Sequence, residues 1–460
     1  MSEARSTWTS EDFERVDALI AEGEARFVAR QPESARLLEK AKKSLAGGVT
    51  SSWQIAWPQP IWVSHGKGSK VFDADDTEYV DLHGGYGVNV VGHAHPEVAE
   101  AIATRAHRGT HFAQPTEDAI AVAEELKRRF GMPLWRFANS GTEATMDAVH
   151  LMRAITGRDY IVKIEGCYHG HHDSVMVSVA NEGEELGPPG APSSPAAGGG
   201  LPQAIIDLAL IAPYNDLPAM ERIFAEHDGA IAGVIIEPIM MNAGIIAPED
   251  GYLAGLIDLA HRHGSLVTFD EVKTGVTIAY GGAIDRLGLR PDIVTLAKAI
   301  GGGVPCGAIG GTEEVMSTIA KGDYDQVGTF NGNPLTMAAA RATLTKVLNE
   351  EAYDHLERLS KQMVDGASSI IVKFDLPAYP IGFGAKGSVT FAPHTVRNYR
   401  DFLEIDERLS HAHWLFQHNG GVFLPPWGKA EQWMLSVQHT EEDASLFLDN
   451  FEEFARALRE

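Results

Sequence analysis

The chain of 460 residues is longer than one hydrophobic core usually supports, so we expect two domains. Its 63 acidic residues outnumber the 38 lysines and arginines, and the net charge of −25 argues against a nucleic-acid or membrane-surface partner. With only two cysteines, Cys167 and Cys306, the sequence indicates neither a disulfide framework nor a cysteine zinc site, and we expect no metal centre.

The amino terminus is polar and acidic and lacks the apolar segment of a secretory signal. No apolar run approaches the roughly 18 residues that a membrane-spanning helix needs. Together with the few cysteines, these features predict a cytoplasmic protein.

The first part of the chain predicts helix followed by short strands. Apolar residues recur at helical spacing between residues 10 and 45, which predicts an amphipathic helix. Residues 61–82 alternate apolar and polar side chains, and the sequence DADDTE predicts a tight turn between two strands. A glycine-rich loop then leads into a helix that Pro96 can open.

From about Thr116 the pattern alternates between helices and short apolar strands, which predicts a mostly parallel sheet flanked by helices. Beyond about residue 350, helices mixed with short alternating strands are typical of a separate α+β lobe. We therefore predict an α/β protein. Its large domain would span residues 81–345, and a smaller domain would combine residues 1–80 with residues 346–460.

Three of the predicted strands end on ionisable residues. Glu237 follows AGVII, Asp270 follows LVTF, and Lys298 follows IVTLA. Open α/β sheets bind their ligands outside the carboxyl ends of buried parallel strands, so these side chains are candidates for an active site.

A lysine and a carboxylate so placed have one well-known joint use. Pyridoxal phosphate (PLP) forms a Schiff base with a lysine amine, and a carboxylate keeps its pyridine nitrogen protonated. Lys298 and Asp270 fit these two roles. The alternative is an ordinary buried ion pair, or a lysine at a helix start that reaches water.

Two polar loops add candidates. Ser140, Gly141 and Thr142 precede a long helical pattern, as either a plain N-cap or a phosphate site. Tyr168 and His169 follow the strand YIVKI, where an aromatic ring can stack on a flat heterocycle and a polar ring can orient it. The histidines of this loop lack the ligand spacing of a catalytic zinc site.

Residues 181–203 are rich in glycine, proline, serine and alanine and show no periodicity, so they predict neither helix nor strand. Such a segment is either a disordered insertion or a mobile lid over an active site.

Several motifs together resemble a known family. SGTEA, YHG, EP followed by an asparagine, DEV, TLAKAIGGG and GTFNGNPLTMAAA occur in the order and spacing of class III (ω-type) PLP-dependent aminotransferases. Within that family the chain is most similar to the glutamate-1-semialdehyde aminomutase branch. The resemblance runs from residue 47 to the HTEED motif at residue 439, and it is more specific for fold and cofactor than for substrate.

This resemblance implies fold type I and a homodimer whose shared active sites lie at the subunit interface. Lys298 would carry the cofactor and shuttle a proton, and Asp270 would pair with the pyridine nitrogen. The other expected cofactor contacts are Ser140, Gly141 and Thr142 at the phosphate, Tyr168 and Val272 on the two ring faces, His169 beside the ring, Asn242 at the phenolic oxygen, Glu237 as a supporting carboxylate, and Thr329 of the partner subunit.

The substrate side departs from the family pattern. In the aminomutases the stretch after GGV reads close to NSPVR, and its arginine grips the substrate carboxylate. Here the stretch is TSSWQ, which leaves Gln54 at that place. Trp53, Gln54, Tyr86 and Glu431 are the candidate substrate residues, and the glutamate falls where the aminomutases also have one.

Two reactions are therefore the leading hypotheses. The first is transfer of an amino group from a small amine, including one without an α-carboxylate, to a ketone, aldehyde or keto acid by a ping-pong cycle through pyridoxamine phosphate (PMP). The second is intramolecular transfer by an aminomutase, an isomerase, which the lid-like segment and Glu431 favour. A non-catalytic relative is disfavoured because Lys298 and Asp270 are both present.

Overall fold

The computed structural model describes residues 7–426, 428–430 and 432–459, and the chain divides into two compact units. The smaller unit comprises residues 1–95, 354–395 and 405–460, and the larger comprises residues 96–353 and 396–404. These boundaries differ from the divisions at residues 80 and 345 that the sequence suggested. No helix in the described ranges combines the length and hydropathy needed to cross a bilayer.

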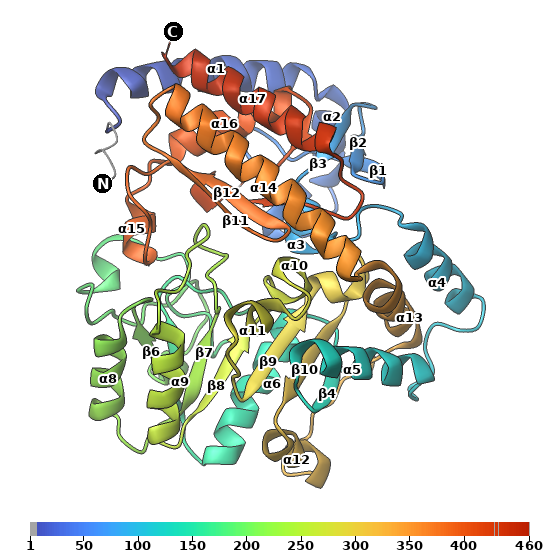
Figure 1. Cartoon of the computed structure of the whole chain (residues 1–460), viewed down its shortest axis with the longest axis vertical. Helices are drawn as coiled ribbons and strands as arrows, with labels where there is room; N and C mark the ends of the chain where they lie inside the picture. Colours follow the sequence, from blue (N-terminus) through green and yellow to red (C-terminus); the bar gives the residue numbers. More distant parts are fainter. Residues whose placement is uncertain (1–6, 427, 431, 460) are drawn as a thin grey trace. The chain divides into compact units, whose positions relative to one another are not determined.

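A seven-stranded sheet forms the centre of the larger unit (Figure 1). Its order is β4-β10-β9-β8-β7-β5-β6, and all strands run parallel except β10, which is antiparallel to both of its neighbours. The strands are β4 Leu134–Ala138, β5 Tyr160–Ile164, β6 Ala209–Ala212, β7 Ile231–Ile236, β8 Leu266–Asp270, β9 Ile293–Ala297 and β10 Gly307–Gly311. The predicted α/β class with a mostly parallel sheet is confirmed.

Helices cover this sheet, since every residue of β7, β9 and β10 is buried. The long helix α6 packs against β7, β9 and β10, while α8 packs on β6 and α9 on β8. The longer helices of this unit are α4 Pro96–Ala106, α5 Glu117–Phe130, α6 Gly141–Thr156, α8 Leu217–Glu226, α9 Tyr252–Arg262, α12 Glu313–Lys321 and α13 Pro334–Ala342. Short helices are α7 Gln203–Ile206, α10 Gly275–Ile278, α11 Gly282–Leu287 and α15 Tyr399–Leu403.

The smaller unit combines two small sheets with long helices. One sheet has the order β1-β2-β3-β13 and the other β11-β12-β14. The strands are β1 Val63–Lys67, β2 Lys70–Asp73, β3 Glu78–Asp81, β11 Tyr379–Phe383, β12 Lys386–Thr390, β13 Val422–Phe423 and β14 Trp433–Met434. The helices are α1 Ser10–Ala29, α2 Pro32–Ala41, α3 Gly84–Gly87, most of α14 Glu350–Lys373, α16 Glu407–Asn419 and α17 Glu441–Arg459.

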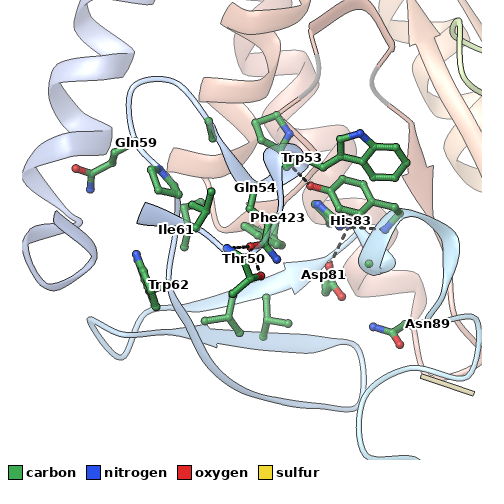
Figure 2. A pocket seen from close by; sticks show the side chains of 18 of the residues that line it. Thr50, Trp53, Gln54, Gln59, Ile61, Trp62, Asp81, His83, Asn89 and Phe423 are labelled. Carbon is green, nitrogen blue, oxygen red and sulfur yellow. Dashed lines mark hydrogen bonds between the residues drawn. The ribbon is translucent and has the colours of Figure 1, made fainter. Parts of the chain in front are cut away.

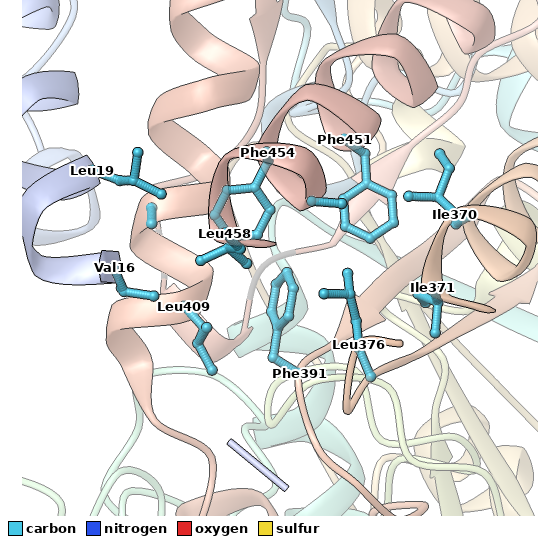
Figure 3. Close-up of a cluster of buried hydrophobic side chains, with 14 residues drawn as sticks. Val16, Leu19, Ile370, Ile371, Leu376, Phe391, Leu409, Phe451, Phe454 and Leu458 are labelled. Carbon is cyan, nitrogen blue, oxygen red and sulfur yellow. The ribbon is translucent and has the colours of Figure 1, made fainter. Parts of the chain in front are cut away.

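One buried cluster joins both ends of the chain in this smaller unit (Figure 3). Val16 of α1 lies in the same cluster as Leu409 of α16 and Phe454 of α17. All three side chains are fully buried. Burial of apolar surface from both termini therefore stabilises this unit.

The predicted helix over residues 10–45 is in fact two helices. α1 ends at Ala29, and α2 begins at Pro32. A proline disfavours helical backbone in the residue before it, and Gln31 is indeed non-helical, with φ −123° and ψ 43°. Similarly, residues 61–82 form three strands and not two, because the sequence GS at 68–69 makes a further turn between β1 and β2.

The glycine- and proline-rich segment 181–203 is held by α15 and the residues around it. The Tyr399 hydroxyl donates to the Asn181 carbonyl at 3.0 Å, and the Arg400 guanidinium donates to the carbonyls of Leu186 and Gly187 at 2.9 and 3.1 Å. Arg400 also forms an ion pair with the buried carboxylate of Glu165 at 2.7 Å. The return of residues 396–404 to the larger unit thus ties this loop to the end of β5, which the sequence pattern did not predict.

Candidate active site

The carboxyl ends of β7, β8 and β9 bring three ionisable residues to one edge of the sheet. The parallel register pairs Ile236 with Phe269 and Asp270 with Thr295. Glu237 therefore lies at the level of Asp270, and Lys298 follows three residues beyond Thr295. This is the edge at which open α/β sheets bind ligands.

Asp270 is buried and held by three neighbours. Its Oδ2 lies 2.7 Å from His169 Nδ1, and its Oδ1 accepts from the Val272 backbone N–H at 3.0 Å and from the Thr295 hydroxyl at 3.3 Å. An ionised carboxylate offers about four acceptor positions, so one remains for a further donor. The carboxylate is thus fixed in orientation and still able to accept a proton-bearing nitrogen.

Lys298 has a left-handed backbone conformation, and the pKa of its amine is lowered. Its φ is +51°, a conformation that costs a residue with a side chain on the order of 1–3 kcal/mol and that concentrates at functional sites. Burial lowers the pKa of its amine, and the carboxylates of Asp270 and Glu237 oppose this effect. A larger neutral fraction makes the amine a better nucleophile at neutral pH.

The amino terminus of α6 is tightly packed and has features typical of an anion site. Ser140 caps the helix by accepting from the Glu143 N–H at 3.2 Å. The N–H groups of Gly141 and Thr142 lack intrahelical acceptors because they lie in the first turn. A Cβ on Gly170 would lie only 2.7 Å from the Thr142 Cα, so a larger residue there would crowd this helix start. Backbone donors and the helix dipole here favour a phosphate.

Val272 and Tyr168 approach this edge from neighbouring loops. Val272 is half-buried and packs on Gly141, where an added Cβ would lie 2.9 Å from the valine Cγ1. Burial raises the pKa of the Tyr168 hydroxyl, and the charge of Asp270 adds to this effect. A valine and a tyrosine near Asp270 suit the two faces of a flat ring.

Glu237 organises two loops and does not point freely into the site. Its Oε1 accepts from the Tyr168 N–H at 3.0 Å, and its Oε2 accepts from the Met241 N–H at 2.8 Å. The Met241 carbonyl in turn accepts from the Lys273 ammonium at 2.7 Å. Asn242 is the next residue along this turn and is half-buried.

Thr329 lies apart from the residues above. It is exposed in the loop before α13 and lines a cavity of about 530 Å³ together with His111, Phe137 and Asn333. A hydrogen bond of 2.9 Å between Asn139 and Asn331 joins this loop to the segment that precedes α6. The expected contact from Thr329 of the partner subunit stays a prediction.

The candidate substrate residues belong to the smaller unit. Trp53 and Tyr86 contact each other edge to face with ring centroids 5.6 Å apart, and the Tyr86 hydroxyl donates to the Trp53 carbonyl at 2.6 Å. Together with Gln54 they line a cavity of about 580 Å³ (Figure 2). Glu431 lies outside the described residues.

Two buried charged residues of the site escaped the sequence analysis. Lys273, 7% exposed, occupies the motif DEVKTG three residues after Asp270, and that lysine within an apolar stretch was the available signal. Glu271 is also buried, and burial raises its pKa to about 7. It accepts from the backbone N–H groups of Ala283 and Ile284, so it holds the start of α11.

These residues fit pyridoxal phosphate. Asp270 has an acceptor position left for a pyridine N–H, and Lys298 has an amine of lowered proton affinity. The amino terminus of α6 offers backbone donors without intrahelical acceptors beside Gly170, which admits no Cβ. The three features match the ring nitrogen, the aldehyde and the phosphate of that cofactor.

Comparison with known proteins agrees with this interpretation. A family model for class III aminotransferases matches residues 54–412. Glutamate-1-semialdehyde 2,1-aminomutase from Anaeromyxobacter sp. (strain Fw109-5) is 40% identical over 435 residues, which cover 93% of this chain and 99% of that protein.

Solved structures share the fold. An omega-transaminase from Sphaerobacter thermophilus has a TM-score of 0.89 at 33% identity, covering 94% of this chain and 100% of its own. A glutamate-1-semialdehyde-aminomutase from Pseudomonas aeruginosa PAO1 has the same TM-score at 29% identity, covering 99% of this chain and 100% of its own, and a variant of it is known in complex with PMP. The chain therefore belongs to the class III aminotransferases, enzymes of fold type I that use pyridoxal phosphate.

Proposed function

We propose that this chain is an aminotransferase that moves an amino group from an amine lacking an α-carboxylate to a ketone, aldehyde or keto acid. When bound, pyridoxal phosphate supplies an aldehyde that condenses with amines and a protonated ring that draws electron density from the substrate carbon. We propose that the protein works as a cytoplasmic homodimer, with Thr329 of the partner subunit at the phosphate.

The residues of the larger unit divide the work among them. Asp270, held by His169 and the Val272 N–H, keeps the ring nitrogen protonated. The amino terminus of α6 would hold the phosphate, Tyr168 and Val272 would lie on the ring faces, and Asn242 would donate to the phenolic oxygen. The Lys298 amine carries the cofactor and then takes up and returns a proton at the substrate carbon.

The proposed substrate class rests on the hydrogen bonds of the Gln54 side chain. Its amide oxygen accepts from both the N–H and the hydroxyl of Thr50, at 3.0 and 2.7 Å (Figure 2). Only its neutral NH2 group is left to meet a substrate, where the aminomutase pattern has an arginine. A charge-assisted bidentate pair is roughly twice as strong as a neutral hydrogen bond, so a substrate carboxylate would lose much of its binding energy here.

The lining of the same cavity supports this reading. Its residues include the aromatic side chains of Trp53, Trp62, Tyr86 and Phe423, and within the described part of the chain they include no lysine or arginine. An aromatic lining without lysine or arginine favours an apolar or aromatic substrate body over an α-carboxylate.

A second candidate is a glutamate-1-semialdehyde aminomutase. It is favoured by the 40% identity to the Anaeromyxobacter enzyme of that name over nearly its whole length. The two candidates differ in stoichiometry, because a transferase consumes a separate acceptor and an aminomutase does not.

We expect the purified enzyme to convert an arylalkyl amine beyond one equivalent per active site only when a carbonyl acceptor is also present. Each half-reaction should interconvert the absorbance bands of the PLP and PMP forms, and product amine should match ketone formed one to one. Chromatography of both products measures this stoichiometry. Isomerisation of glutamate semialdehyde with no acceptor, at a rate above that of the amine, would instead establish the aminomutase.

We expect Lys298→Ala to abolish turnover, by about a thousandfold or more, because it removes both the cofactor linkage and the proton carrier. PMP should still bind, since the phosphate and ring contacts remain. Steady-state rates and PMP titration measure the two effects. Lys346→Ala, at an exposed lysine paired with Glu97, is the control and should act like wild type. Retained turnover in the Lys298 variant would contradict the assignment.

We expect Asp270→Asn to lower kcat by about a hundredfold or more, because a neutral amide does not hold the ring nitrogen protonated. The matched control is Asp292→Asn. Asp292 lies just before the amino-terminal end of β9, whereas Asp270 lies at the carboxyl end of β8. The Asp292 carboxylate accepts from the Val267 N–H at 2.8 Å. Near-native activity of the Asp270 variant would make that carboxylate structural.

We expect Gln54→Arg to raise kcat/KM for a β-amino acid relative to an arylalkyl amine by about tenfold, because the new guanidinium can pair with the carboxylate. Gln59→Arg is the matched control, since it adds the same charge elsewhere on the cavity wall. The ratio of the two kcat/KM values is the measurement. A wild-type preference for the carboxylate that Gln54→Arg leaves unchanged would refute the proposed substrate class.

A further inference from the structure

Lys273 is a buried lysine close in the strand register to Lys298, the expected cofactor lysine. The register pairs Asp270 with Thr295, so Lys273 and Lys298 each lie three residues beyond paired positions of adjacent parallel strands. The segments that follow them, α10 Gly275–Ile278 and the 3₁₀ turn Lys298–Gly301, also contact each other. Lys273 is only 7% exposed.

The Lys273 ammonium completes a chain of hydrogen bonds across three loops. It donates to the Met241 carbonyl at 2.7 Å, and the Met241 N–H donates to Glu237, which also accepts from the Tyr168 N–H. The loops after β5, β7 and β8 are thereby joined. Asn242 follows Met241 directly, so Lys273 holds the turn that presents this asparagine.

The charge of Lys298 also acts on Lys273. Burial and the nearby charge of Lys298 lower the pKa of Lys273 to about 7, against the attraction of Glu237. The other charged groups that face Lys298 are the carboxylates of Asp270 and Glu237. A positive charge on either amine disfavours a second proton on the other, which is a known way to activate a lysine.

We propose that Lys273 is a positioning residue of this enzyme, which holds the Asn242-bearing turn in place and, when protonated, places a positive charge close to Lys298. The inference rests on the proposed function, in which Lys298 carries the cofactor. Lys273 touches neither cofactor nor substrate in this role, and it works through the Met241 carbonyl and through its charge.

The experiment compares three holoenzyme variants that separate the hydrogen bond from the charge. Lys273→Met removes both, Lys273→Gln keeps a donor without charge, and Lys273→Arg keeps both. The first readout is the midpoint of the pH titration of the bound cofactor's visible absorbance, which reports the proton at the Lys298 nitrogen. The second is the dissociation constant of PMP, which binds without a covalent link.

We expect Lys273→Met and Lys273→Gln to raise the titration midpoint by about one pH unit, because a neighbouring positive charge is lost. Lys273→Arg should keep the midpoint at or below that of wild type. Only Lys273→Met should weaken PMP binding, by about tenfold, since Asn242 is no longer held. Lys163→Met is the matched control, because Lys163 is also a buried lysine. The groups that act on Lys163 are Cys167, Glu237 and Glu165, so this variant should keep the wild-type midpoint.

Circular dichroism and thermal melting identify variants that fold. If Lys273→Met does not fold, the titration midpoint of Lys273→Gln still tests the role of the charge. An unchanged midpoint in the neutral variants, or unchanged PMP affinity in Lys273→Met, overturns the inference. Borohydride trapping followed by peptide mapping separates the two proposals. Cofactor trapped on a lysine other than Lys298 refutes the proposed function, whereas trapping on Lys298 with an unmoved midpoint refutes only the role of Lys273.

Discussion

The parallel register of β7, β8 and β9 is the constraint on which the candidate site depends. It places Glu237, Asp270 and Lys298 at one buried edge, where each charge requires a partner to offset its desolvation. Asp270 takes its partners from the loop after β5, from its own loop and from β9. Satisfying one buried carboxylate therefore holds three segments in place, and the same bonds orient it for a ring nitrogen.

Close packing accompanies this electrostatic arrangement. Gly141 packs against Val272, and Gly170 packs against Thr142. Neither glycine has room for a Cβ. Lys298 keeps a left-handed backbone that its surroundings must enforce. Such rigidity suits a site that must hold a flat cofactor between two loops and against one helix terminus, because binding then costs little further ordering of the protein.

The expected cofactor residues and the proposed substrate residues lie in different parts of this molecule. The features typical of class III aminotransferases lie in the larger unit, whereas Gln54, Trp53 and the aromatic cavity lie in the smaller one. A fold can host several reactions when the residues that bind the substrate change independently of those that bind the cofactor. The chain can therefore resemble aminomutases over most of its length, even though we propose a substrate without an α-carboxylate for it.

The sequence by itself determined the α/β class, the cofactor and the edge at which Glu237, Asp270 and Lys298 lie. Apolar strand patterns, the residues that end them and helix N-caps are local signals, readable within a few residues. Only the tertiary structure decided that His169 bonds to Asp270, 101 residues away, that Lys273 joins three loops, and that residues 396–404 return to the larger unit. Partners so distant along the chain are set by strand order and register, which local patterning does not encode.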